Sequence, residues 1–152
     1  MAGKKIAVVR VRGSVDTPGR LNDTMRMLGL TRVNHCSIVG ERQAGMISLC
    51  KDYLTWGEVD KETLGALVMK RGMKVGNKRI TPEDISKAGF KSIDEFVSKF
   101  LNSEVGLDAI GIKKVFRLHP PRKGHGFIKL VHPKGALGNR KGEMGELLKR
   151  MM

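Results

Sequence analysis

The sequence predicts an α+β fold, with a ferredoxin-like, split βαβ core followed by a C-terminal extension of helices and a β-hairpin. Two observations predict it. Within residues 1–59, apolar β-branched runs alternate with amphipathic helical patterns as β-α-β-α-β, the order of a small split-βαβ sheet with both helices on one face. Residues 60–152 follow a different order, helical patterns first and then two alternating segments. We therefore predict a core at 1–59 and an extension at 60–152.

The first strand is predicted over residues 6–12, an apolar β-branched run that ends at Gly13. A helix follows, because Thr17 is a favoured N-cap residue and Pro18 suits the first helical position. Its apolar residues recur at i, i+4 and i+7, and Gly29 ends it. The segment therefore reads as strand, turn and amphipathic helix.

The second strand is predicted over residues 36–39 and the third over 54–59. The helix between them has an apolar face of Met46, Leu49, Cys50 and Tyr53. A dinucleotide-binding fold is not favoured, because the turn at 13–19 lacks the G-x-G-x-x-G spacing that lets backbone approach a pyrophosphate.

Three helices are predicted in the first half of the extension. One lies between Asp60 and Gly72, and a short one starts at the cap residue Thr81. The third starts at Ser92, which forms the S-x-x-E pattern of a capping box with Glu95.

A β-hairpin is predicted next, with strands over 115–119 and 127–132. The connection at 120–126 holds two prolines, two glycines and three basic residues, so we expect a basic turn. Asn139 is a suitable N-cap for a last helix, whose apolar residues are Met144, Leu147, Leu148 and Met151.

The charge of the chain predicts an anionic partner. Lys and Arg number 29 against 15 Asp and Glu, for a formal net charge of +14. Residues 109–142 contain no acid, and a second run at 70–79 holds five cations and no acid. Such stretches repel themselves unless something anionic lies against them.

Several classes of protein are excluded. No apolar run approaches the roughly 18–20 residues that cross a bilayer. The apolar run at 6–9 is also shorter than the ~7–15 residues of a signal peptide, so we expect an intracellular protein. Cys36 and Cys50 form no CxxC pair and read as core thiols. The four histidines, at His35, His119, His125 and His132, are spaced singly and do not form a metal-binding motif. The sequence also contains no nucleotide-binding loop and no catalytic motif. We therefore expect no metal, no cofactor and no enzymatic activity.

The type of nucleic acid follows from the aromatic content, which is 5%. An RNA-recognition sheet displays stacking aromatic residues on its central strands, and the strand at 6–12 has none. The prediction is therefore recognition of folded or double-helical nucleic acid by Lys and Arg contacts to phosphates, with base stacking not the main mode.

Short motifs in a fixed order carry a resemblance that spans almost the whole chain: VVRVRG at 8–13, LGL at 28–30 followed by Arg32 and Asn34, GMI at 45–47, WG at 56–57, KRG at 70–72, NKRI at 77–80 and GNR at 138–140. Together they resemble the large-ribosomal-subunit protein family numbered thirty, whose eukaryotic counterpart is numbered seven, in its longer archaeal form. The shorter bacterial relatives end near Val59. The chain shows no long Lys-rich N-terminal extension of the eukaryotic type, which favours an archaeal source.

The resemblance implies a ferredoxin-like structural constituent of the large subunit of the cytoplasmic ribosome, without enzymatic activity. The implied partners are large-subunit ribosomal RNA, the 5S ribosomal RNA and neighbouring ribosomal proteins, with no membrane. The residues expected to bind RNA, from the family motifs and the basic composition together, are Arg10, Arg12, Arg20, Arg32, Lys70, Arg71, Lys74, Lys78, Arg79, Arg117, Arg122, Lys123, His125, Lys129, Lys134, Arg140 and Lys141.

Two other functions remain as alternatives. A DNA-compacting architectural protein is also small and basic, which explains the charge but not the ordered motifs. An enzyme acting on RNA is the third reading.

Overall fold

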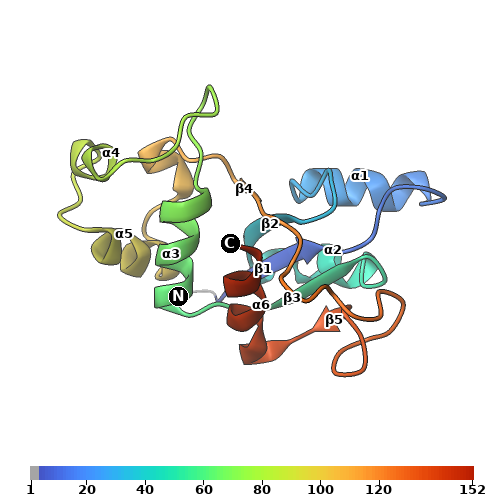
Figure 1. Ribbon diagram of the computed structural model, residues 1–152. Coiled ribbons are helices and arrows are strands. Elements are labelled where there is room, and N and C mark those ends of the chain that lie inside the picture. The colour runs from blue at the N-terminus through green and yellow to red at the C-terminus, as the bar shows by residue number, and fades with distance from the viewer. Residues whose placement is uncertain (1–3) are drawn as a thin grey trace.

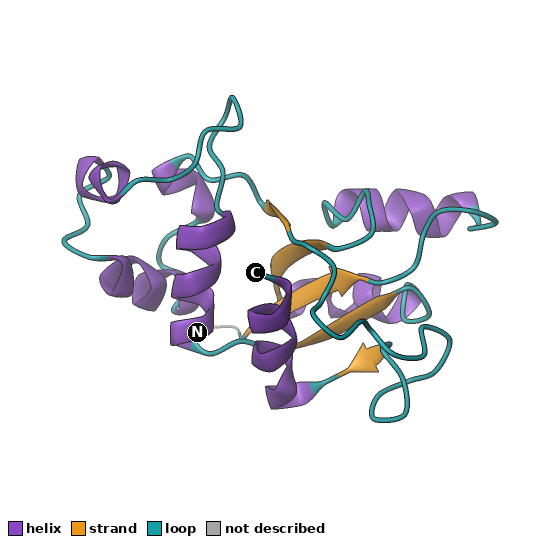
Figure 2. Ribbon diagram, in the orientation of Figure 1, coloured by secondary structure: helices purple, strands orange, loops and turns teal. Residues whose placement is uncertain are grey.

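The computed structural model describes residues 4–152 and contains one mixed sheet with helices on both faces (Figures 1 and 2). The strand order is β4-β2-β1-β3-β5. The strands are β1 Lys5–Arg10, β2 His35–Gly40, β3 Leu54–Glu58, β4 Val115–Arg117 and β5 Gly138–Asn139. The α-helices are α1 Gly19–Met27, α2 Ala44–Leu49, α3 Lys61–Arg71, α4 Pro82–Lys87, α5 Ile93–Leu101 and α6 Met144–Met151, and short 3-10 turns lie at Glu41–Gln43, Leu107–Ile110 and Lys141–Glu143.

The three core strands confirm the predicted fold class. Strand β1 is central and pairs antiparallel with β2 and β3, so that Val8 lies opposite Ser37 on one side and Trp56 on the other. Strands β2 and β3 are therefore parallel to each other with β1 between them, and α2 connects them. This is a split βαβ unit, the basis of the ferredoxin-like fold.

Helices α1 and α2 lie on the same face of the sheet, as predicted. Alternation along β1 sends Val8 to that face, where it packs with Met25 of α1 and Ile47 of α2. Two local details differ from the prediction. Pro18 occupies the N-cap position of α1, and Ile47 is the buried residue of α2 while Leu49 is exposed, because the helix has fewer than two turns.

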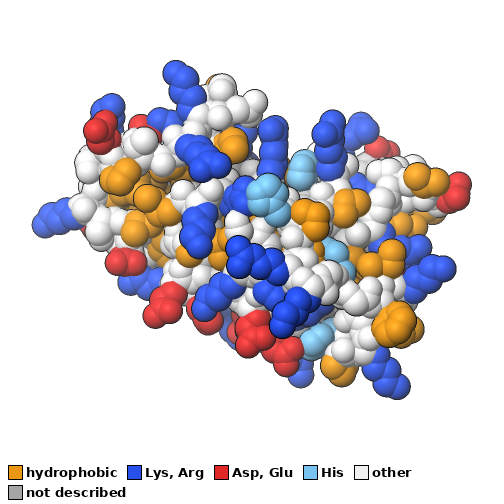
Figure 3. Space-filling view, in the orientation of Figure 1, with side chains coloured by type: hydrophobic (Ala, Val, Ile, Leu, Met, Phe, Trp, Pro, Cys, Tyr) orange, Lys and Arg blue, Asp and Glu red, His pale blue; other side chains and the backbone are white. Residues whose placement is uncertain are grey.

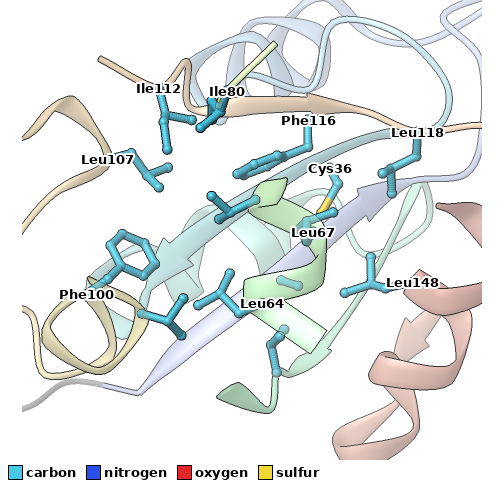
Figure 4. Packing of buried hydrophobic residues seen from close by; sticks show 14 of the residues in the cluster. Cys36, Leu64, Leu67, Ile80, Phe100, Leu107, Ile112, Phe116, Leu118 and Leu148 are labelled. Atoms are coloured by element: carbon cyan, nitrogen blue, oxygen red, sulfur yellow. The ribbon is translucent and has the colours of Figure 1, made fainter. Parts of the chain in front are cut away.

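The opposite face of the sheet carries the larger core (Figure 4). Ala7 and Val9 point to this face and are buried with residues from α3, α5 and α6. All four apolar residues predicted for the last helix are buried there. Because α6 packs against α3 and β3, the C-terminal helix is positioned by elements from the first half of the chain.

The N-caps of α4 and α5 follow the predicted pattern. Thr81 forms a capping box with Asp84. The Ser92 hydroxyl accepts a hydrogen bond from Glu95 N at 3.3 Å, and the Glu95 carboxylate accepts one from the backbone N–H of Lys91. In each helix, side-chain oxygens accept hydrogen bonds from the backbone N–H groups of the first turn, which have no partner within the helix.

The predicted β-hairpin is wrong. Residues 115–117 do form a strand, but it pairs with β2, with Phe116 opposite Cys36. Residues 127–137 fold back on themselves, with Ala136 N donating to Phe127 O at 2.9 Å and Leu137 N to Leu130 O at 3.1 Å. We refer to this segment as the 127–137 loop. Alternation identified 115–117 correctly as extended but not its partner, whereas residues 127–132 form turns with one isolated bridge residue, Val131.

Asn139 is also placed differently from its prediction. It lies in β5 opposite Trp56 of β3, and α6 begins only at Met144. Its side-chain oxygen accepts a hydrogen bond from Lys141 N at 2.8 Å, which is a local turn contact just before the 3-10 turn whose N-cap is Arg140.

Both cysteines are free and buried, as predicted. Burial raises the pKa of the Cys36 thiol to about 12, so this thiol is not a reactive group near neutral pH.

None of the helices within residues 4–152 is long and apolar enough to span a membrane.

Candidate nucleic-acid interface

In the view of Figure 3, Lys and Arg side chains lie across the middle of the visible face, around α6 and the loops beside it. We call this surface the basic face. Its residues are connected by the contacts described below, and they are Arg32, Arg117, His119, Arg122, Lys123, His125, Lys134, Arg140 and Arg150. Seven of these nine were predicted from the sequence.

The turn at 120–126 forms the centre of the basic face because it lies against the end of α6. Arg122 N donates to Arg150 O at 3.1 Å, and His119 N donates to Met151 O at 3.0 Å. Pro121 is buried, whereas the side chains of Arg122 and Lys123 are exposed. The backbone of the turn is thus anchored on the fold while its charges face solvent.

A hollow of about 320 Å³ opens beside this turn. It is lined by Lys123, Gly124, His125, Gly126, Phe127, His132, Pro133, Lys134, Gly135, Arg140 and Arg150, and no carboxylate of residues 4–152 is among the lining groups. Glu143 lies nearby, with its Oε2 2.9 Å from His132 Nε2. The hollow is therefore a concave site of one charge sign, which suits an anion.

The pKa values in the hollow reflect its positive potential. Burial lowers the pKa of His125, and the charges of Arg140 and Arg150 lower it further. Burial, followed by the charge of Arg150, also lowers the pKa of Arg140. The ring of His125 is held by Asn34 Oδ1, 3.2 Å from its Nε2, while its Nδ1 is buried without a hydrogen-bond partner. A bound anion would relieve the repulsion among these groups.

Arg140 is oriented by the sheet. Its Nε donates to Thr55 Oγ1 at 3.0 Å, and its Nη2 donates to Ala136 O at 3.2 Å. Thr55 in turn donates to Gly138 O at 3.1 Å. Because two of its three nitrogens are held, the guanidinium loses little freedom when it binds a phosphate.

Arg32 and Arg117 extend the basic face along the β2–β4 edge. Arg117 lies opposite His35 in the ladder, and burial together with the charges of Arg117, Arg32 and Arg10 lowers the pKa of His35. Leu118 N donates to Asn34 O, and Asn34 also contacts His125. The two parts of the basic face are therefore joined through Asn34.

A second group of cations surrounds the turn at 73–79, separate from the hollow. Lys70, Lys78 and Arg79 are exposed. Lys113 joins them, because its Nζ donates to Asn77 Oδ1 at 2.9 Å. Arg71, by contrast, is half-buried and donates from Nη2 to the backbone oxygen of Met152 at 2.6 Å.

Lys74 is engaged inside the protein. Its Nζ lies 2.6 Å from Asp84 Oδ2, and the Asp84 carboxylate also accepts hydrogen bonds from Thr81 N and Thr81 Oγ1. The hydrogen bond from Lys74 and those from Thr81 hold the pKa of Asp84 well below its usual value. Lys74 therefore stabilises the start of α4, and we leave it out of the proposed RNA contacts.

Asp84→Asn should lower stability at pH 7 by an amount that shrinks in acid. The folded-state pKa of Asp84 is below the unfolded value of 3.8, so its contribution is complete above about pH 4 and is lost as pH falls further. Urea unfolding midpoints of wild type and variant, compared between pH 7 and pH 3, test this. A difference between the wild-type and variant midpoints that is the same at pH 7 and pH 3 would contradict the stabilising role of the Asp84 carboxylate.

Arg10 is a correction to the predicted site. Its side chain is 2% exposed. Nη1 donates to Leu30 O at 2.9 Å and Thr31 O at 3.2 Å, Nε to Arg12 O at 2.9 Å, and Nη2 to Ser14 Oγ at 2.9 Å. The guanidinium N–H groups donate to backbone and hydroxyl oxygens of the protein. Arg10 therefore connects the end of β1 to the segment after α1 and is not available to bind a phosphate.

The remaining predicted residues lie apart from the hollow. Arg12 is half-buried, 5.1 Å from the centre of the Tyr53 ring, and Arg20 is exposed on α1. Lys129 is exposed at the tip of the 127–137 loop. Lys141 lines a different hollow with Glu41 and Glu58, so its charge is partly compensated by the protein itself.

Sequence reasoning missed Arg150, His119, His132 and Lys113 as members of these surfaces. Arg150 lies beyond the acid-free stretch and reads as a cation at a helix C-terminus, where it also suits the helix dipole. The contact between Arg150 and residue 122 is tertiary, and no local pattern signals it.

Within residues 4–152, no three His, Cys, Asp or Glu side chains are grouped to hold a metal ion.

Known proteins resemble this chain over most of its length. The family model described as ribosomal protein L30p/L7e matches residues 6–54. The large ribosomal subunit protein uL30 of Methanococcus maripaludis is 48% identical over 151 residues, which covers 96% of this chain and 98% of that protein. The proteins of the same name from Methanothrix thermoacetophila and Archaeoglobus fulgidus are 44% and 40% identical, each over 95% of this chain and 98% of its own length.

Proposed function

The chain belongs to the ribosomal protein L30p/L7e family, and on that premise we propose that it binds folded ribosomal RNA through Lys and Arg contacts to phosphates. As in the rest of this family, its role is structural and not enzymatic, as a component of the large ribosomal subunit. The proposed partners include the 5S ribosomal RNA and neighbouring ribosomal proteins.

The observation that carries the proposal is the composition of the hollow on the basic face. Four permanently charged residues, Lys123, Lys134, Arg140 and Arg150, line it without a carboxylate among the lining groups of residues 4–152. Cations held this close destabilise the free protein unless an anion binds, and a phosphodiester backbone supplies regularly spaced anions. Arg and Lys on turns and helix ends are suited to bind such a backbone.

The proposed contact residues are the basic face together with Lys70, Lys78, Arg79 and Lys113 at the second group. Arg12, Arg20 and Lys129 are exposed or half-exposed and extend the surface to either side. Arg10 and Lys74 act within the fold. This assignment keeps most of the predicted residues, leaves out Arg10, Arg71, Lys74 and Lys141, and adds His119, Arg150 and Lys113.

Reversing the charge of the turn should separate RNA binding from folding. In Arg122→Glu with Lys123→Glu, stability should change by no more than about 0.5 kcal/mol, because both side chains are exposed. Incorporation into the large subunit should fall sharply, because two phosphate-binding cations become repulsive. Co-sedimentation with the large subunit in a sucrose gradient measures incorporation, and a urea melt measures stability.

The matched control is Lys61→Glu with Lys87→Glu, the same charge change at exposed positions of α3 and α4 outside the basic face. It should sediment like wild type. Equal incorporation of both double variants would contradict the placement of the RNA contacts at the turn.

The DNA-compacting alternative is not favoured, because proteins named as large-subunit components align with the whole chain at 40–48% identity. The same gradient separates the two functions. A ribosomal component sediments with the large subunit after nuclease removal of DNA, whereas a DNA-compacting protein does not.

A further inference from the structure

We propose that the hollow on the basic face receives one unpaired nucleotide of the bound RNA, with its base stacked on the ring of Phe127. The inference rests on the proposed RNA-binding function and adds to it a second kind of contact, which is not electrostatic. Phosphate contacts alone leave the exposed aromatic ring beside the hollow unexplained.

Phe127 is the exposed aromatic residue of the protein, with 71% of its surface open to solvent. Phe90, Phe96, Phe100 and Phe116 are buried, and Tyr53 and Trp56 are half-buried. An aromatic ring left in water gives up the stabilisation that burial provides. Its position in the wall of a cationic hollow suits a ligand that is both aromatic and anionic, as a nucleotide is.

The polar groups of the hollow complement the rest of a nucleotide. Lys123, Lys134, Arg140 and Arg150 can bind its phosphate, as proposed above. The Nδ1 of His125 is buried beneath the surface of the hollow, so the groups that a nucleotide can reach are the exposed ring and the cations. The site therefore offers a face for the base and charge for the phosphate.

The 127–137 loop fixes the backbone that carries Phe127 before RNA binds. Four backbone hydrogen bonds close the loop: Ala136 N to Phe127 O, Leu137 N to Leu130 O, Gly135 N to Val131 O and His132 N to Leu137 O. A Cβ at Gly135 would collide with the carbonyl of Leu130, so the close approach needs glycine there. A preformed loop reduces the entropy lost on binding.

RNA fits this site better than a protein partner does. Ile128, Leu130 and Val131 next to Phe127 are also exposed, and such a patch alone would suit an apolar protein surface. An apolar partner covering the hollow would bury its cations without counter-charges, which is costly. A nucleotide stacks on the ring and neutralises the cations together.

Phe127→Ala should weaken binding to deproteinised large-subunit ribosomal RNA by about 5- to 150-fold, the range for loss of one stacked base. The salt dependence should stay the same, because no charge is removed. Phe127→Trp should retain the affinity, whereas Phe127→Leu, apolar but unable to stack, should lose most of it. The control is Met27→Ala, an exposed apolar position at the end of α1 that is outside the proposed contact residues.

Fluorescence of the Phe127→Trp protein gives a second readout, after subtraction of the Trp56 signal measured in wild type. A 12-nucleotide single strand rich in adenine should quench the new tryptophan by stacking, and a fully paired 12-base-pair RNA duplex at equal phosphate concentration should not.

The outcomes separate this inference from the function on which it rests. If wild type fails to bind ribosomal RNA, the proposed function fails. If wild type binds and Phe127→Ala binds equally well, only the stacking inference is overturned. The same result combined with poor retention of Phe127→Ala in assembled subunits would overturn it in favour of a protein partner on the 127–137 loop.

Discussion

Raising the monovalent salt concentration from 50 to 200 mM should weaken binding to large-subunit ribosomal RNA by about 10³- to 10⁴-fold. The basic face and the second group offer enough cations to neutralise about 6–8 phosphates, and each neutralised phosphate releases condensed counterions on binding. The logarithm of affinity should then fall against the logarithm of salt with a slope of about −5 to −7.

Filter binding at five or six salt concentrations measures this slope directly. Arg150→Ala should make it shallower by about one, because one phosphate contact is lost. Arg42→Ala, which removes an exposed cation outside the basic face, is the matched control and should leave the slope unchanged. A slope close to zero for wild type would refute phosphate binding as the source of affinity.

Replacing Arg10 with methionine should destabilise the protein by about 2–4 kcal/mol, through oxygens left without donors. Leu30 O, Thr31 O and Arg12 O all accept hydrogen bonds from this side chain. Methionine fills much of the volume but donates nothing. Arg10→Lys should recover little, because a single ammonium cannot reach acceptors arranged around a planar guanidinium.

Urea unfolding measures the effect, with Arg32→Met as control because Arg32 is exposed on the basic face. The two variants should behave in opposite ways: Arg10→Met loses stability and binds RNA normally while folded, whereas Arg32→Met keeps stability and binds more weakly. A stable Arg10→Met protein with weakened RNA binding would restore Arg10 to the interface.

Local patterns were sufficient to predict most elements of the fold. The β-branched run at the start predicted β1, capping residues predicted the starts of α4 and α5, and apolar spacing predicted the buried face of α6. The hairpin failed because residues 127–132 form turns and because alternation shows only that a segment such as 115–117 is extended. Which strand it pairs with depends on the edge that the tertiary fold leaves free, here that of β2.

The candidate site was predictable in its charge and not in its geometry. Arg10 and Arg12 look alike in the sequence, two residues apart in one basic motif. Only the approach of residues 30–31 to the end of β1 encloses Arg10 and leaves Arg12 accessible. Arg150 joined the site for the corresponding reason, because the packing of α6 on the core carries it to the turn at 120–126.

The short outer strands of the sheet have a consequence for the protein before it is assembled into the large subunit. Unpaired strand edges recruit further strands and lead to aggregation, and native sheets limit this with short edges and charge. Strand β4 has three residues and β5 has two, and Lys114, Arg117 and Arg140 lie in or beside them. A newly made copy therefore offers only short strand edges for pairing with other copies, and the positive charges beside those edges make two copies repel each other.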